Sequence, residues 1–174
     1  MLSSRVHIQL CCSNWSYVFC ARLRLRTFLF YGEGFMVCTF FGHRQVTKEI
    51  EPTLRAVLID LIENHDVKRF YVGNHGGFDA MVQRALKELS LTYAIHFYVV
   101  LAYLPEKKGK NDFSTIFPEG LETVPKRFAI SYRNKWMIER ADYVVTYVNH
   151  NIGSGAAQFK ELAEKRGKHI IEIG

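Results

Sequence analysis

Three glycine-bearing segments carry the residues best suited to binding chemistry, and each follows an apolar run and precedes a helical pattern. A glycine turn lets a ligand approach the backbone, and the helix N-terminus behind it offers free N–H groups and partial positive charge to a phosphate. We therefore predict a phosphate-binding site formed by Gly42, His43 and Arg44, by Gly73, Asn74, Gly76, Gly77 and Asp79, and by Asn149, Gly153, Ser154 and Gly155.

Side chains in these segments suggest distinct roles. The guanidinium of Arg44 can bind a phosphate or a carboxylate through two parallel hydrogen bonds. The alternative interpretation is that Arg44 is an ordinary surface arginine and that His43 caps a loop. Asp79 falls at a helix start, where it can cap free N–H groups. Without a ligand, the second segment would be a simple turn with a capping aspartate.

Catalytic and metal-binding patterns are weaker. The sequence shows no Ser-His-Asp or Cys-His arrangement, so we assign no catalytic residue, although His75 and His150 lie in glycine loops where a histidine can act as acid or base. Three of the four cysteines lie in the first 20 residues, and none forms a CxxC pair. We expect neither a metal nor a cofactor.

The elements that must position these loops follow from hydrophobic periodicity. Strands are expected at 36–41, 67–72, 95–102, 142–148 and 169–173, and helices at about 48–64, 78–89, 130–140 and 156–166. Such alternation predicts an α/β protein with a single Rossmann-like domain, in which a five-stranded parallel sheet of order 3-2-1-4-5 has helices on both faces. Loops at the carboxyl ends of parallel strands should converge on one pocket. Residues 113–128 suggest only short helical turns.

Residues 1–35 do not fit this pattern and are predicted to be an N-terminal extension to a domain of residues 36–174. The first 32 residues contain no acidic side chain and show no clear period. We expect translation to start at Met36, which would make the upstream stretch misassigned coding sequence. A basic, acid-poor transit peptide is the alternative.

Charge and composition limit the classes of partner that the protein is expected to bind. Residues 1–35 contribute +3 of the net charge of +6, so residues 36–174 are only mildly basic, and nucleic acid is an unexpected partner. Because no run of 18 apolar residues occurs, a membrane partner is not expected either. A lone strand cysteine, Cys38, suits a reducing cytoplasm. A homodimer is an open alternative to a monomer.

Several motifs together resemble the SLOG superfamily, the Rossmann-like group that includes the LOG phosphoribohydrolases and the DNA-processing protein DprA. They are Phe41-Gly42-His43-Arg44, Gly73 through Ala80, Phe117-Pro118-Glu119-Gly120, Val124 through Ile130, Arg133-Asn134 and Ala141-Asp142. The likeness spans residues 36–174, and it is greatest to small, uncharacterised bacterial members.

The resemblance implies that Arg133 binds a ligand phosphate. On spacing alone, Arg133 would instead belong to a solvent-facing basic helix face with Lys135 and Arg140. LOG enzymes cleave the N-glycosidic bond of nucleoside monophosphates with a catalytic glutamate, and Phe159 stands where that glutamate is expected. Glu161 is two residues away, which turns it roughly 200° around a helix.

These observations predict a protein that binds a nucleotide or a nucleotide-derived small molecule at the strand carboxyl ends, acting as a sensor. The alternative is a LOG-like hydrolase acting on the N-glycosidic or phosphate bond of such a ligand. DprA-like nucleic-acid binding is a third and less favoured interpretation, because no strip of interleaved arginines and aromatic residues is present.

Overall fold

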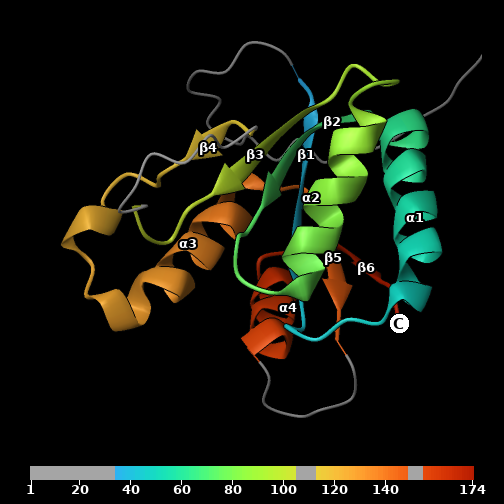
Figure 1. Ribbon diagram of the computed structural model, residues 1–174. Coiled ribbons are helices and arrows are strands. Elements are labelled where there is room, and N and C mark those ends of the chain that lie inside the picture. The colour runs from blue at the N-terminus through green and yellow to red at the C-terminus, as the bar shows by residue number, and fades with distance from the viewer. Residues whose placement is uncertain (1–33, 105–112, 149–154) are drawn as a thin grey trace, which may run out of the picture. The chain divides into compact units, whose positions relative to one another are not determined.

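Strand β1 (Met36–Gly42) lies in the middle of a parallel sheet, and its neighbours are β2 and β5. The computed structural model describes residues 34–104, 113–148 and 155–174. The other strands are β2 (Val67–Val72), β3 (His96–Val100), β4 (Thr115–Ile116), β5 (Tyr143–Tyr147) and β6 (His169–Glu172), and the sheet order is β4-β3-β2-β1-β5-β6 (Figure 1). Every adjacent pair is parallel, as expected for a Rossmann-like α/β fold.

The predicted strands all form, in the predicted relative order, but the predicted count of five is wrong. A sixth strand, β4, pairs with the outer edge of β3. Two backbone hydrogen bonds hold it, from the Val99 N–H to the Ser114 carbonyl at 2.9 Å and from the Leu101 N–H to the Ile116 carbonyl at 2.8 Å. A strand of two residues is too short to show any alternation in the sequence, so periodicity could not reveal it.

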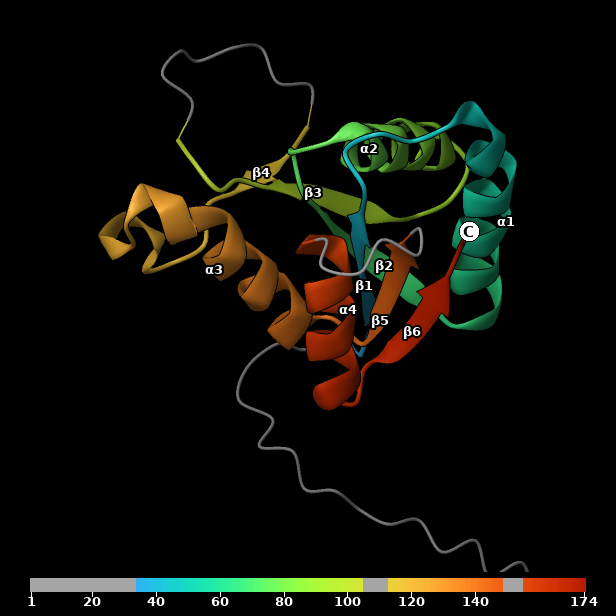
Figure 2. The ribbon, with the colours of Figure 1, turned by 90° about the horizontal axis from the view of Figure 1, so that it is seen from below.

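Helices cover both faces of the sheet, as predicted. Figure 2 shows α1 (Glu51–Asn64) and α2 (Gly77–Leu89) on one side, and α3 (Lys126–Arg140) and α4 (Gly155–Lys165) on the other. Two single-turn 3-10 helices, η1 (Lys48–Ile50) and η2 (Leu121–Thr123), precede α1 and α3. Pro52 lies in the first turn of α1, where its missing N–H leaves no helical hydrogen bond unmade, and Gly167 just after α4 has a φ of 66°, which favours glycine.

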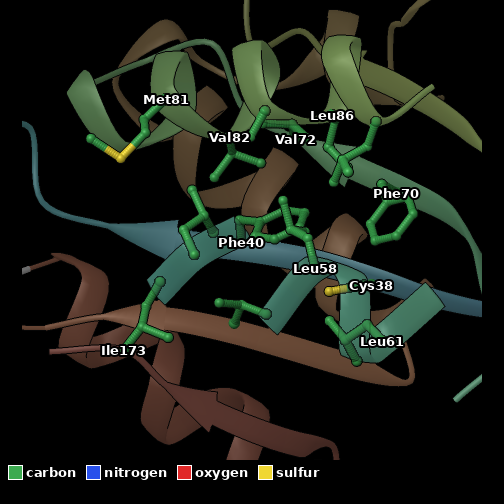
Figure 3. Close-up of a cluster of buried hydrophobic side chains, with 14 of the residues drawn as sticks. Cys38, Phe40, Leu58, Leu61, Phe70, Val72, Met81, Val82, Leu86 and Ile173 are labelled. Carbon is green, nitrogen blue, oxygen red and sulfur yellow. The ribbon is translucent and has the colours of Figure 1, made fainter. Parts of the chain in front are cut away.

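Successive side chains of β1 enter the two halves of the core. Phe40 packs with the helices α1 and α2, whereas Phe41 packs with α3 and α4. Figure 3 shows the first half, where Phe40 and Phe70 from the sheet meet Leu58 of α1 and Val82 of α2. Because both faces of the central strands β1 and β5 are buried, these strands are almost continuously apolar, which makes them recognisable in the sequence.

The chain reverses its direction of travel across the sheet between β1 and β5. It runs outward from β1 through β2 and β3 to β4, and then returns through α3 to β5 on the other side of β1. In open α/β sheets, ligands bind in the crevice at the carboxyl ends of the strands at such a switch point. The fold therefore places the expected site between the loops that follow β1 and β5.

Candidate functional site

A cleft of about 400 Å³ lies at this switch point. Its walls come from the end of β1 and the loop that follows it, the loop after β2, the first turn of α2, the middle of α3 and the first five residues of α4. They comprise Phe40, Phe41, Gly42, His43, Arg44, His75, Asp79, Ile130, Arg133, Asn134, Gly155, Ala156 and Phe159. The structure thus brings together six of the predicted site residues, namely Gly42, His43, Arg44, Asp79, Arg133 and Gly155. Asn149, Gly153 and Ser154, and also His150, lie outside the described residues.

Arg133 is the most unusual side chain of the cleft, because it is only 3% exposed. Its Nε donates to Asn134 Oδ1 at 3.0 Å, and its Nη1 donates to Asn74 Oδ1 at 3.3 Å and to the Val100 carbonyl at 3.4 Å. The interpretation from spacing alone, a solvent-facing basic helix face, is wrong for Arg133, although Lys135 and Arg140 are exposed. Burial lowers the pKa of Arg133, and the attraction of Asp79 opposes that shift.

Asp79 is the acidic partner in the cleft and is only 8% exposed. It lies in the first turn of α2, and its Oδ2 accepts a hydrogen bond of 2.9 Å from the His75 N–H. Burial raises the pKa of Asp79, whereas Arg133 and the His75 N–H lower it. Asp79 therefore accepts a hydrogen bond from the N–H of His75, just before the helix, and not from the N–H groups of the first turn as its expected capping role implies.

Gly73 is required where Asp79 and Arg133 approach each other. A Cβ atom at this position would collide with Asp79 Oδ2, and it would lie 2.7 Å from Arg133 Nη1. Gly73 is itself buried, and its carbonyl accepts a hydrogen bond of 2.7 Å from Gln83 Nε2. Its place in the predicted site is thus behind the two charged side chains.

Gly76 and Gly77 pack against the first loop. The Gly77 N–H donates to the Arg44 carbonyl at 2.8 Å, and a Cβ on Gly77 would lie 2.6 Å from that oxygen. Gly76 has a φ of 132°, a conformation that favours glycine, and a Cβ there would lie 3.3 Å from the Arg44 Cα. These contacts hold the loops after β1 and β2 together, and neither glycine is among the cleft-lining residues given above. A direct contact with phosphate at Gly76 or Gly77 stays a prediction.

The first turn of α4 contributes a second positive feature to the cleft. Gly155 and Ala156 begin this helix of 11 residues and line the cleft. The N-terminus of a helix carries partial positive charge and unpaired N–H groups that suit an anion. Arg44, which is exposed, and the buried Arg133 add full positive charges to the same cleft. The arrangement is therefore suited to binding an anionic group.

The position expected for a LOG-type catalytic glutamate also faces this cleft. Phe159 lines it, and its ring stacks on Phe41 with a centroid distance of 5.5 Å. Glu161 instead borders a groove between α3 and α4, and its carboxylate pairs with Lys165 one helical turn away. An apolar ring thus occupies the position at which the family resemblance predicts a carboxylate.

Asn134 and Ile130 were missed as cleft residues. Asn134 is 6% exposed and fixes the guanidinium of Arg133, while Ile130 forms part of the wall on the same helix. The pair Arg133-Asn134 had been noted within the family resemblance, and this adjacency was the available hint. Nothing in the residue type of Ile130 separates a cleft wall from an ordinary core position.

His75 gives the cleft a testable pH dependence. Burial and the charges of Arg133 and Arg44 lower its pKa below the usual value, and its Nδ1 is buried without a hydrogen-bond partner among the residues that the structure describes. As the pH falls below about 6.5, the unfolded chain gains a proton at this histidine before the folded chain does. His75 therefore removes stability as the pH falls from the unfolded pKa to the lower folded pKa.

We expect His75→Asn to reduce the drop in melting temperature between about pH 7.5 and about pH 5.5. Asp79 acts in the opposite sense, because its raised pKa lets the folded state bind a proton first as the pH falls. The matched control is His96→Asn, which changes an exposed histidine at the start of β3. If His75→Asn and the wild type lose melting temperature equally on acidification, this electrostatic description of the cleft is incorrect.

Two other hollows in the described structure were compared with this cleft as candidate ligand sites, and the same residues were searched for a metal site. A smaller hollow of about 200 Å³ lies near Ser90 and His96, and the groove between α3 and α4 measures about 440 Å³. Of the three, the switch-point cleft is the one that contains a buried arginine. Within residues 34–104, 113–148 and 155–174, no group of three or more His, Cys, Asp or Glu side chains could hold a metal ion.

Helices in the part of the chain that the structure describes are too short or too polar to cross a lipid bilayer.

Comparison of the chain with known family models and with curated proteins finds no match. The functional conclusion therefore depends on the cleft itself and on the motifs quoted from the sequence.

Proposed function

We propose that the protein binds the phosphate group of a nucleotide or a nucleotide-derived small molecule in the switch-point cleft. The observation that carries this proposal is the buried Arg133, whose guanidinium lies in a cleft that also contains Arg44 and the first turn of α4. Burying a charged side chain is costly, and an anionic ligand would offset that cost. Such sites are a common use of Rossmann-like folds.

The proposal includes membership of the SLOG superfamily, a bacterial origin and a sensor role in the cytoplasm. The motifs quoted above support the family, and they surround the cleft at Gly42, Arg44, Asp79 and Arg133. A cytoplasmic location is supported by Cys38, a buried and unpaired cysteine in the core. A sensor needs ligand binding without turnover, which agrees with the apolar ring of Phe159 in the cleft.

A LOG-like hydrolase is the alternative. Cleavage of an N-glycosidic bond passes through a positively charged transition state that a carboxylate stabilises. Phe159 cannot supply this group, and Glu161 pairs with Lys165 outside the lining of the cleft. We therefore expect little release of free base from AMP, GMP, CMP or UMP. Multiple-turnover release that Arg133→Ala abolishes would favour the hydrolase.

A thermal-shift series tests the binding proposal. AMP, GMP, CMP, UMP, ADP-ribose and NAD are compared with the corresponding unphosphorylated nucleosides. A ligand that binds only the folded state stabilises it by about 2.7 kcal/mol at a concentration of 100 Kd. We expect at least one nucleotide to raise the melting temperature while its nucleoside has little effect. Equal shifts with nucleoside and nucleotide would contradict a phosphate site.

A further inference from the structure

Asp79 is a carboxylate in a cleft otherwise suited to anions. Among the cleft-lining residues that the structure describes, it is the only acidic side chain, and it shares the cleft with Arg44 and Arg133. Asp79 balances part of the charge of the buried Arg133, but its negative charge also repels a phosphate, so phosphate binding does not by itself explain why this carboxylate lines the cleft. A hydrogen-bond-donating second component of the ligand would make use of it.

The hydrogen bonds of Asp79 leave acceptor capacity unused. Its Oδ2 accepts the His75 N–H, and no other hydrogen bond joins the carboxylate to another residue of the described chain. An ionised carboxylate accepts hydrogen bonds at two oxygens and about four lone-pair positions. The carboxylate therefore has acceptor positions left for donors on a ligand.

The size of the cleft indicates that a ligand extends beyond its phosphate. A volume of about 400 Å³ falls within the range of pockets that hold whole small molecules. The groups that would match Asp79 are neutral donors, because the neighbouring Arg133 and Arg44 already supply positive charge. Two adjacent hydroxyl groups on a sugar present two O–H donors to one carboxylate.

We propose that Asp79 is a specificity-determining residue that accepts hydrogen bonds from a vicinal diol of a sugar phosphate, while the phosphate lies on Arg133 and Arg44. The ligand class is a phosphorylated ribose compound rather than its 2-deoxy counterpart. This inference rests on the proposed phosphate site and adds the residue that distinguishes ribose from deoxyribose.

Calorimetric titration of the full chain tests the proposal with three probes. Methyl phosphate carries only the anion, 2-deoxyribose 5-phosphate lacks the vicinal diol at positions 2 and 3, and ribose 5-phosphate has it. We expect ribose 5-phosphate to bind at least about tenfold more tightly than the other two, as hydrogen bonds to a charged group allow. Equal affinities for the two sugar phosphates in the wild-type protein would overturn the proposal.

The variant Asp79→Asn gives the second arm. It should reduce the preference for ribose 5-phosphate to less than about twofold, and it should raise methyl phosphate affinity because a repelling negative charge is removed. Glu161→Gln, which removes a carboxylate outside the cleft lining, should keep the wild-type preference. A preference that survives in Asp79→Asn would assign ribose recognition to another residue and refute the proposal.

A measurement on the wild-type protein covers the case in which Asp79→Asn does not fold. The carboxyl carbon of Asp79, followed by NMR, should shift more with ribose 5-phosphate than with methyl phosphate, and equal shifts would contradict a diol contact. The two proposals fail in different ways. If methyl phosphate binding depends on Arg133 but ribose 5-phosphate binds no more tightly than 2-deoxyribose 5-phosphate, only the assignment of the diol to Asp79 fails. If methyl phosphate binding does not depend on Arg133, the phosphate site fails as well.

Discussion

Replacing Arg133 with alanine is expected to weaken nucleoside monophosphate binding by about 1.5–3 kcal/mol, the range for a hydrogen bond to a charged group. The expected loss follows from the position of the guanidinium, which is 3% exposed and held by Asn134, Asn74 and the Val100 carbonyl. A pre-positioned fork binds a phosphate without first having to order a flexible side chain. Calorimetric titration of the two proteins measures the difference.

The matched control is Arg140→Ala on the same helix. Arg140 is exposed, and its guanidinium lies 4.1 Å from the centre of the Trp136 ring. This variant should bind within about twofold of wild type, because a solvent-exposed charge contributes little. Arg133→Lys should recover only part of the loss, since lysine keeps the charge without the planar fork. If Arg133→Ala and Arg140→Ala lower affinity equally, the phosphate does not lie on Arg133.

Replacing Phe78 with alanine should lower the free energy of unfolding by about 3–5 kcal/mol, as expected for a large cavity in a core. Phe78 is fully buried, and its ring stacks on Tyr147 with a centroid distance of 5.8 Å. It also supports the first loop of the cleft, because a Cβ on Gly42 would collide with its ring. Denaturant titration followed by circular dichroism measures the loss.

Phe128→Ala is the corresponding control for core packing. Phe128 lies near the start of α3 and is 50% exposed. Its removal should change the free energy of unfolding by no more than about 0.5 kcal/mol, as is usual for surface substitutions. A loss of no more than about 0.5 kcal/mol in Phe78→Ala as well would contradict the cavity expected from removing this buried ring.

The strands of the sheet, apart from β4, could be predicted from the sequence because burial makes β1 and β5 nearly continuous apolar runs and gives β2, β3 and β6 short apolar stretches. The relative strand order followed from short, right-handed connections. β4 could not be predicted in this way, because it pairs with β3 through backbone hydrogen bonds, such as those that the Ser114 and Ile116 carbonyls accept, which any residue type can make.

The site was harder to predict than the fold. The burial of Arg133 depends on Asn74, which is 59 residues away, and on Val100, which is 33 residues away, so helical spacing around Arg133 carried no information about it. Similarly, Gly77 was recognised as part of a glycine loop, but its contact with the Arg44 carbonyl arises only when two loops meet. The motifs located the cleft because they follow neighbouring parallel strands.

Mapping AMP binding on isotope-labelled protein by NMR tests the phosphate site most directly. The amide signals of Arg44, His75, Asp79, Gly155 and Ala156 should shift with AMP concentration, because these residues line the cleft at the switch point. Ser90 and His96, which line a separate hollow, should not respond. Shifts centred on Ser90 and His96, or on Lys135 and Lys165 in the groove between α3 and α4, would contradict the proposed site.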